Sequence, residues 1–232
     1  MKNTKKVAIV IGGGHNGLTA AAYLAQTGKK VLVLERRHVL GGAAVTEEIF
    51  PGFKYSVCSY VVSLLKSNII RELRLAEFGL ELLPLESTFT PLESDFLLRT
   101  SDPDETYREI YRHSPKDAET YFRFGPLMGQ IGMAVRPILE TIAPNLILPS
   151  LSDLGSLKNL LSHFKSLGSE QFEYLCKLMT MSSADFLDEW FEFEPLKATL
   201  SASGIIGNFM GPRSPGSAYV MLHHYMGDID GS

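Results

Sequence analysis

The chain has 232 residues, 45% of them hydrophobic, which is enough for one large or two small domains with a real core. Its 22 basic and 26 acidic residues give a net charge of −4 at pH 7, which excludes a general attraction to nucleic acid or anionic lipid. Cys58 and Cys176 form no C-x-x-C motif, which argues against a disulfide framework, a metal site and a local redox dithiol. A reducing, cytoplasmic setting fits these cysteines, and no apolar run reaches the length of about 18 residues that predicts a transmembrane segment.

The first predicted elements are a strand, a glycine turn and a helix. Residues 7–11 form an unbroken apolar run, which predicts a parallel strand covered on both faces. Gly12, Gly14 and Gly17 then form a G-x-G-x-x-G motif. In this motif the first glycine allows a sharp turn, the second lets a diphosphate approach the backbone, and the third lets the helix pack closely on the strand. The free N–H groups at the start of the predicted helix, residues 16–27, favour phosphate binding.

An acidic residue closes the second predicted strand. Residues 31–34 form this strand, and Glu35 follows it, about 20 residues beyond the glycines, where a carboxylate accepts hydrogen bonds from ribose hydroxyls. The order of strand, glycine turn, helix, strand and acid predicts dinucleotide binding. The alternative is a glycine-rich turn with an incidental acid.

The residues after Glu35 distinguish FAD from NAD(P). Arg36 and the pair Gly41-Gly42 give the pattern E-R-x(4)-G-G, which resembles the flavoprotein extension of the fingerprint in the amine-oxidase and phytoene-desaturase superfamily. The resemblance implies that the second glycine pair lies against the FAD diphosphate and that Arg36 lies near the adenosine. A carboxylate at position 35 would repel the 2′-phosphate of NADP, so FAD is the predicted cofactor. The predicted cofactor-binding residues are Gly12, Gly13, Gly14, Asn16, Gly17, Glu35, Arg36, Gly41, Gly42 and Ala43.

The next segments predict a hairpin and a helix. Residues 46–65 contain a turn at Pro51-Gly52 and predict a hairpin and a helix start that fill the core. These residues also resemble the segment along the flavin side in phytoene-desaturase-like proteins. Cys58 is expected to be a small buried apolar residue. Residues 67–78 predict a helix, capped by Ser67 or Asn68 and ended by Gly79.

The pattern changes near residue 80, which suggests a domain boundary between residues 1–79 and 80–232. Residues 80–85 and 89–100 predict half-exposed strands. Helices are expected from residue 104 to about 200, with Asp104 and Ser114 as caps. Gly125-Pro126 and later prolines are expected to interrupt them, and the apolar residues 127–142 to pack internally.

The C-terminal region offers no clear catalytic group. Residues 217–225 predict a helix or strand, begun by Ser214 or Ser217. His223 and His224 are candidates for a base, but adjacent residues point to different sides, and a packing role is the preferred interpretation. Flavin-dependent dehydrogenation needs no protein nucleophile, so no catalytic residue and no metal ligand is assigned.

The whole chain resembles the N-terminal part of the phytoene-desaturase-related family of FAD-dependent oxidoreductases. The similar segments are VIGGGHNGLTAAAYLA, VLERRHVLGGAA, FPGFKYSVCSYVVSLL, DEWFEFEPLKA and GPRSPGSAYVMLHH. The resemblance implies an α/β fold with a Rossmann-like FAD-binding βαβ unit, followed by a mixed antiparallel-sheet and helical substrate domain. It also implies oxidoreduction of an apolar or amine-like small molecule.

Members of that family are longer and return to complete the FAD domain with further strands. The parallel sheet is therefore expected to be incomplete, with an unpaired apolar edge that a second chain or a missing C-terminal half completes. Two hypotheses remain: an FAD-dependent oxidoreductase or its N-terminal fragment, and a catalytically silent dinucleotide-binding or interaction module. The sequence leaves the substrate, the electron acceptor and the oligomeric state open.

Overall fold

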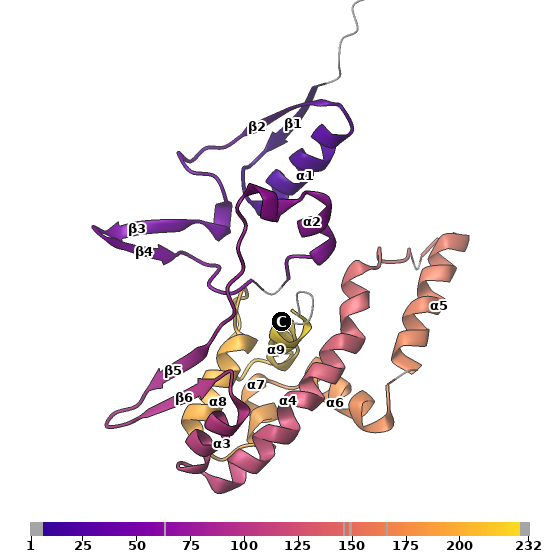
Figure 1. Ribbon diagram of the computed structural model, residues 1–232. Coiled ribbons are helices and arrows are strands. Elements are labelled where there is room, and N and C mark those ends of the chain that lie inside the picture. The colour runs from indigo at the N-terminus through magenta and orange to yellow at the C-terminus, as the bar shows by residue number, and fades with distance from the viewer. Residues whose placement is uncertain (1–6, 63, 146, 149, 166, 228–232) are drawn as a thin grey trace, which may run out of the picture. The chain divides into compact units, whose positions relative to one another are not determined.

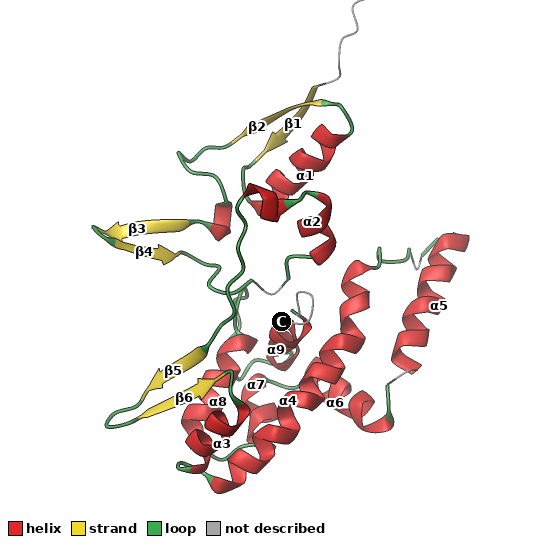
Figure 2. Cartoon of the chain, in the orientation of Figure 1, coloured by secondary structure: helices red, strands yellow, loops and turns green. Residues whose placement is uncertain are grey.

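The computed structural model describes residues 7–62, 64–145, 147–148, 150–165 and 167–227. The chain divides into two compact units, the first ending at Leu82 and the second starting at Leu83. Both are drawn in Figures 1 and 2. None of the described helices is long and apolar enough to cross a membrane.

The first unit contains a parallel strand pair, a hairpin and short helices. Its elements are β1 (Val7–Ile11), α1 (His15–Gln26), β2 (Lys30–Leu34), η1 (Gly42–Ala44), β3 (Thr46–Phe50), β4 (Phe53–Ser56), α2 (Ser67–Glu72) and η2 (Leu75–Phe78).

The parallel pair is covered on one face only. β1 and β2 pair in register from Val7 opposite Lys30 to Ile11 opposite Leu34, and α1 packs against both strands. Among the described residues this sheet has two strands, so the prediction of an incomplete parallel sheet is confirmed. The prediction that β1 is covered on both faces is wrong, because no other described element of this unit covers the side away from α1. Ile9 and Ile11 are therefore 60% and 86% exposed.

The hairpin of β3 and β4 forms as predicted, with Gly52 in its turn at a φ of 84°. Its aromatic side chains do not fill a core, however, since Phe50 and Phe53 are both more than half exposed. Cys58 is exposed as well, and the prediction of a buried thiol is wrong. The reason is the same in both cases: residues 46–62 add no second layer to the parallel pair.

The helix predicted for residues 67–78 is divided in two. Arg74 has a left-handed φ of 53°, which ends α2 and starts the 3-10 turn η2. The N-cap of α2 is Lys66, without a side-chain cap, and not the predicted Ser67 or Asn68. Gly79, at a φ of 92°, ends η2 as predicted, because glycine adopts this conformation without strain.

The second unit is a hairpin followed by helices. Its elements are β5 (Ser87–Pro91), β6 (Phe96–Thr100), α3 (Pro103–Tyr111), α4 (Pro115–Val135), η3 (Arg136–Glu140), α5 (Leu151–Lys165), α6 (Ser169–Thr180), α7 (Ser183–Asp188), α8 (Glu194–Ser201), η4 (Ala202–Gly204) and α9 (Ser217–Met226).

Two strand predictions in this unit are wrong. Residues 80–85 form no strand, in keeping with Pro84, which has no N–H for a sheet ladder. Residues 89–100 are not one strand but parts of two, because a tight turn closed by Leu92 N–H and the Asp95 carbonyl oxygen (2.9 Å) folds the chain back.

α4 is the central helix of the second unit. It continues through Pro126, so the predicted interruption there is wrong. The carbonyl of Phe122 loses its helical hydrogen bond there, because Pro126 has no N–H. Met128, Ile131 and Val135 form its buried stripe, which confirms internal packing for this part of residues 127–142, whereas Ile142 is 89% exposed.

A buried carboxylate joins the start of α4 to the start of α8. Asp117 is fully buried and accepts hydrogen bonds from the N–H groups of Glu192 (3.0 Å) and Phe193 (2.8 Å). Ser114 caps α4 as predicted, since its Oγ accepts from the Asp117 N–H at 3.2 Å. The cap of α3 is Asp102 and not the predicted Asp104, whose own N–H is the capped group.

Candidate functional site

The glycine loop lies at the carboxyl ends of β1 and β2. Gly12 has a φ of 103°, and its N–H donates to the carbonyl oxygen of Leu34 at 2.7 Å, which ties the turn to the second strand. A Cβ on Gly17 would overlap the carbonyl oxygen of Gly12. The sequence therefore needs glycine at position 17 for α1 to start this close to β1.

The N-terminus of α1 presents backbone N–H groups that no side chain caps. Gly14 is the N-cap and makes no side-chain cap bond. The first helical hydrogen bond runs from the N–H of Leu18 to the carbonyl oxygen of Gly14 at 2.9 Å. The N–H groups of residues 15–17 precede this bond, and together with the helix dipole they favour an anion. A Cβ at Gly12 would meet no atom within 4 Å, so an anion can approach this backbone closely.

Glu35 faces the loop. Its Oε2 accepts from the Gly13 N–H at 2.7 Å, and its Oε1 accepts from the Arg37 N–H at 2.9 Å. The backbone N–H of Arg37, and next that of Gly13, lower the pKa of the Glu35 carboxyl, so it is ionised at neutral pH. Because the pKa of Glu35 is lowered in the folded unit, its hydrogen bonds stabilise the loop fully at a pH above the ordinary pKa of a glutamate. This stabilisation is lost as the pH falls through the lowered pKa. A carboxylate has about four acceptor positions, which leaves capacity for ribose hydroxyls.

The glycine pair Gly41-Gly42 lies against the glycine loop at residues 12–14. The N–H of Gly41 donates to the carbonyl oxygen of Gly13 at 2.7 Å, and Gly14 and Gly41 form an isolated parallel bridge. A Cβ on Gly42 would lie 2.9 Å from the Cα of Gly14. Positive φ values of 120° at Gly41 and 62° at Gly42 further favour glycine. The structure thus brings all six of the predicted glycines and Glu35 together around one loop.

Three predicted residues lie beside this loop without a defined role. Asn16 is in the first turn of α1, Arg36 follows Glu35, and Ala43 is in η1. All three are exposed, and among the described residues their side chains make no hydrogen bond or ion pair.

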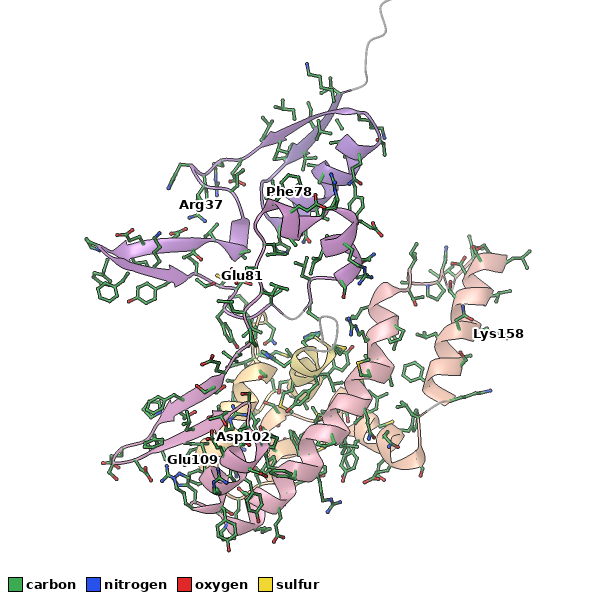
Figure 3. All side chains as sticks on the ribbon, in the orientation of Figure 1. Arg37, Phe78, Glu81, Asp102, Glu109 and Lys158 are labelled. Atoms are coloured by element: carbon green, nitrogen blue, oxygen red, sulfur yellow. The ribbon has the colours of Figure 1, made fainter. Side chains whose placement is uncertain are left out.

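Two neighbours of the loop carry no signal in the sequence. A Cβ on Gly13 would lie 2.6 Å from Cδ2 of Leu40, so Leu40 also restricts the loop. Arg37, labelled in Figure 3, forms an ion pair with Glu47 of β3. This ion pair links the loop after β2 to the hairpin of β3 and β4. It could not be predicted from the sequence, because it depends on how the folded unit places the hairpin beside the loop.

The histidines of α9 lie in the second unit. His223 and His224 are half-buried, and burial lowers the pKa of each. Both are therefore neutral at pH 7. Among the described residues no group of three or more acidic, histidine or cysteine side chains is arranged to hold a metal ion.

The strand, glycine loop, helix, second strand and facing acid define a Rossmann-like dinucleotide-binding domain. Residues 10–73 match the family model described as an NAD(P)-binding Rossmann-like domain.

Similarity to known proteins covers most of the chain. The chain is 42% identical to pyridine nucleotide-disulfide oxidoreductase domain-containing protein 2 from Rattus norvegicus over 97% of its own length and 41% of the relative. The Mus musculus protein gives the same figures. One of the subunits of limonene dehydrogenase from Castellaniella defragrans is 41% identical over 49% of this chain and 21% of the relative. The resemblance predicted from the sequence is confirmed, and the chain spans 41% of the length of the rat and mouse relatives.

Proposed function

We propose that the first unit binds FAD and that the chain is an FAD-dependent oxidoreductase, or the N-terminal part of one, that acts on an apolar or amine-like organic substrate. The observation that carries this proposal is the loop at residues 12–17, where an ionised Glu35 and a second glycine pair face the same backbone. The rat and mouse relatives are named as containing an oxidoreductase domain, and the bacterial relative as part of a dehydrogenase.

Each part of the loop has a role in holding the cofactor. The N–H groups of residues 15–17 and the bare backbone at Gly12 and Gly14 would hold the diphosphate. Glu35 would accept from the ribose hydroxyls, and Gly41-Gly42 would approach the phosphates. Bound FAD supplies an acceptor for a hydride from the substrate.

The charge of Glu35 favours FAD over NADP. Its lowered pKa keeps the carboxylate negative at neutral pH, and a 2′-phosphate at the same place would be repelled. The second glycine pair favours FAD over NAD because it completes the pattern E-R-x(4)-G-G, which resembles the flavoprotein extension of the fingerprint.

The second unit would be the substrate domain, with the division between the domains near residue 80. Because the chain spans 41% of its rat and mouse relatives, completion of the parallel sheet by further sequence or by a second chain is part of the proposal. A cytoplasmic location is also part of the proposal, because the two free cysteines fit a reducing compartment. We do not propose disulfide reduction, since the sequence contains no paired cysteine motif.

Cofactor binding is the direct test. We expect the purified chain to bind ADP and FAD, to show flavin absorption, and to lose that colour when a candidate amine or apolar substrate is added without oxygen. NADP should bind more weakly than ADP. A colourless chain that binds ADP would favour the catalytically silent module, and a chain that binds neither ADP nor FAD would overturn the proposal.

Replacing Glu35 by alanine should weaken ADP binding by about 1–3 kcal/mol, the usual effect of losing hydrogen bonds to a charged group. Glu35→Gln keeps the shape of the side chain but removes its charge and one of its two acceptor oxygens. Isothermal titration with ADP measures both variants. The control is Glu81→Ala, which removes an exposed carboxylate of the same unit, labelled in Figure 3. Unchanged ADP affinity in Glu35→Ala would remove Glu35 from the site.

A further inference from the structure

The ion pair between Arg37 and Glu47 lies in the first unit, at the loop after β2. Nη2 of Arg37 donates to Oε1 of Glu47 on β3, and the two side chains are 41% and 37% exposed. Both charged groups are therefore accessible to solvent. Arg37 follows Glu35 by two positions, so the ion pair begins beside the acid of the candidate nucleotide site.

The backbone of Arg37 belongs to that site. Its N–H donates to Oε1 of Glu35 at 2.9 Å, while Oε2 of the same carboxylate accepts from the Gly13 N–H at 2.7 Å. Arg37 thus contacts the carboxylate that would accept the ribose hydroxyls. An arginine near the end of the second strand is also the residue with which NADP-binding domains hold the 2′-phosphate. Arg37 has the position for this role, but its guanidinium is engaged by Glu47.

The ion pair changes what a 2′-phosphate would meet at this place. A free guanidinium forms two parallel N–H bonds with a phosphate and attracts it. The guanidinium of Arg37 already has a carboxylate as its partner, so a phosphate would have to displace Glu47. Binding sites discriminate in this way when an arrangement disfavours the wrong ligand, in addition to contacts that favour the right one.

We propose that Glu47 is a specificity-determining residue for the adenosine end of the cofactor. It holds Arg37 in an ion pair and thereby disfavours nucleotides that carry a 2′-phosphate, which adds to the repulsion from the ionised Glu35. Glu47 acts through Arg37 and needs no contact with the cofactor. This inference rests on the proposed function, because it requires Glu35 to face the ribose.

Titration of the full chain with ADP-ribose and with 2′-phospho-ADP-ribose tests the role of Glu47. The two probes differ only in the 2′-phosphate, and low ionic strength keeps the charges unscreened. We expect the parent chain to prefer ADP-ribose. Glu47→Gln should reduce this preference by about threefold to tenfold, through tighter binding of the 2′-phosphate form by the released guanidinium. Its affinity for ADP-ribose should stay near that of the parent, because an exposed ion pair contributes little to stability.

Two double variants show whether the effect runs through Arg37. Glu47→Gln combined with Arg37→Met has the net charge of the parent but lacks the guanidinium, so the preference should return to the parental value. Glu47→Gln combined with Arg36→Met should keep the reduced preference, because Arg36 is not the partner of Glu47.

The matched control is Glu48→Gln, which removes the same charge from the next residue of β3. The carboxylate of Glu48 accepts from the Gly52 N–H at 2.7 Å in the hairpin turn, and a glutamine oxygen can replace this acceptor. Among the described residues Glu48 pairs with no arginine. The preference for ADP-ribose should therefore stay at the parental value.

The outcomes separate this inference from the proposed function. An unchanged preference in Glu47→Gln, an equal reduction in Glu48→Gln, or a reduction that persists without Arg37 would overturn the role of Glu47. In each of these cases binding of ADP-ribose by the parent chain would leave the nucleotide site intact. A parent chain that binds neither probe would instead contradict the proposed function itself.

Discussion

Replacing Gly17 by alanine should strongly weaken nucleotide binding by the first unit. The added Cβ would overlap the carbonyl oxygen of Gly12, so either α1 must move away from β1 or the loop must change its path. Both responses displace the N–H groups of residues 15–17 from the diphosphate. We expect ADP affinity to fall by about 100-fold or more, or about 3 kcal/mol, in an isothermal titration.

Gly129→Ala is the matched control, because it makes the same change in a helix without a clash. A Cβ at Gly129 of α4 meets no atom within 4 Å. This variant should bind ADP as the parent does, and its second unit should gain about 0.5–1 kcal/mol of stability. Parental ADP affinity in Gly17→Ala would show that the loop at residues 12–17 is not the nucleotide site.

Replacing Asp117 by alanine should destabilise the second unit by about 3–5 kcal/mol. Asp117 is fully buried, and its carboxylate accepts from the N–H groups of Glu192 and Phe193 before α8. Alanine would leave a cavity and remove the acceptor of both N–H groups. Asp117→Asn keeps one carbonyl oxygen, so its effect should be intermediate. Urea denaturation followed by the fluorescence of Trp190 measures these changes.

The control for this series is Glu119→Ala, since Glu119 is an exposed carboxylate on the same helix. Its effect should stay within about 0.5 kcal/mol. If Asp117→Ala were no more destabilising than Glu119→Ala, the hydrogen bonds to residues 192 and 193 would not stabilise the fold.

The candidate nucleotide site was predictable because its determinants are local. Gly12, Gly17 and Glu35 lie within one strand-helix-strand unit, and each has a stereochemical reason for its position. The structure places Glu35 on the Gly13 N–H and the Gly41-Gly42 pair on the same loop. The structure gives no such position for the exposed side chains of Arg36 and Asn16, because an exposed side chain is not fixed by its neighbours in sequence.

Features that depend on packing between residues far apart in the sequence were not predicted. The alternation in residues 89–100 indicates a strand, but it does not reveal the turn that separates β5 from β6. Burial of Cys58 was predicted from residue type alone, and the structure leaves it exposed. The pattern of residues 89–100 predicts a half-exposed strand, and it does not show that the Nε of Arg99 on β6 is buried.

The bond between Asp117 and the chain before α8 also sets an order of events during synthesis. The two N–H donors lie 75 and 76 positions after the carboxylate. At about 5–20 residues per second, a ribosome needs about 4–15 s to translate this distance. Until then the carboxylate at the start of α4 has no such partners. The second unit can therefore complete its folding only after residues 192 and 193 have been made, well after the longest of its described helices.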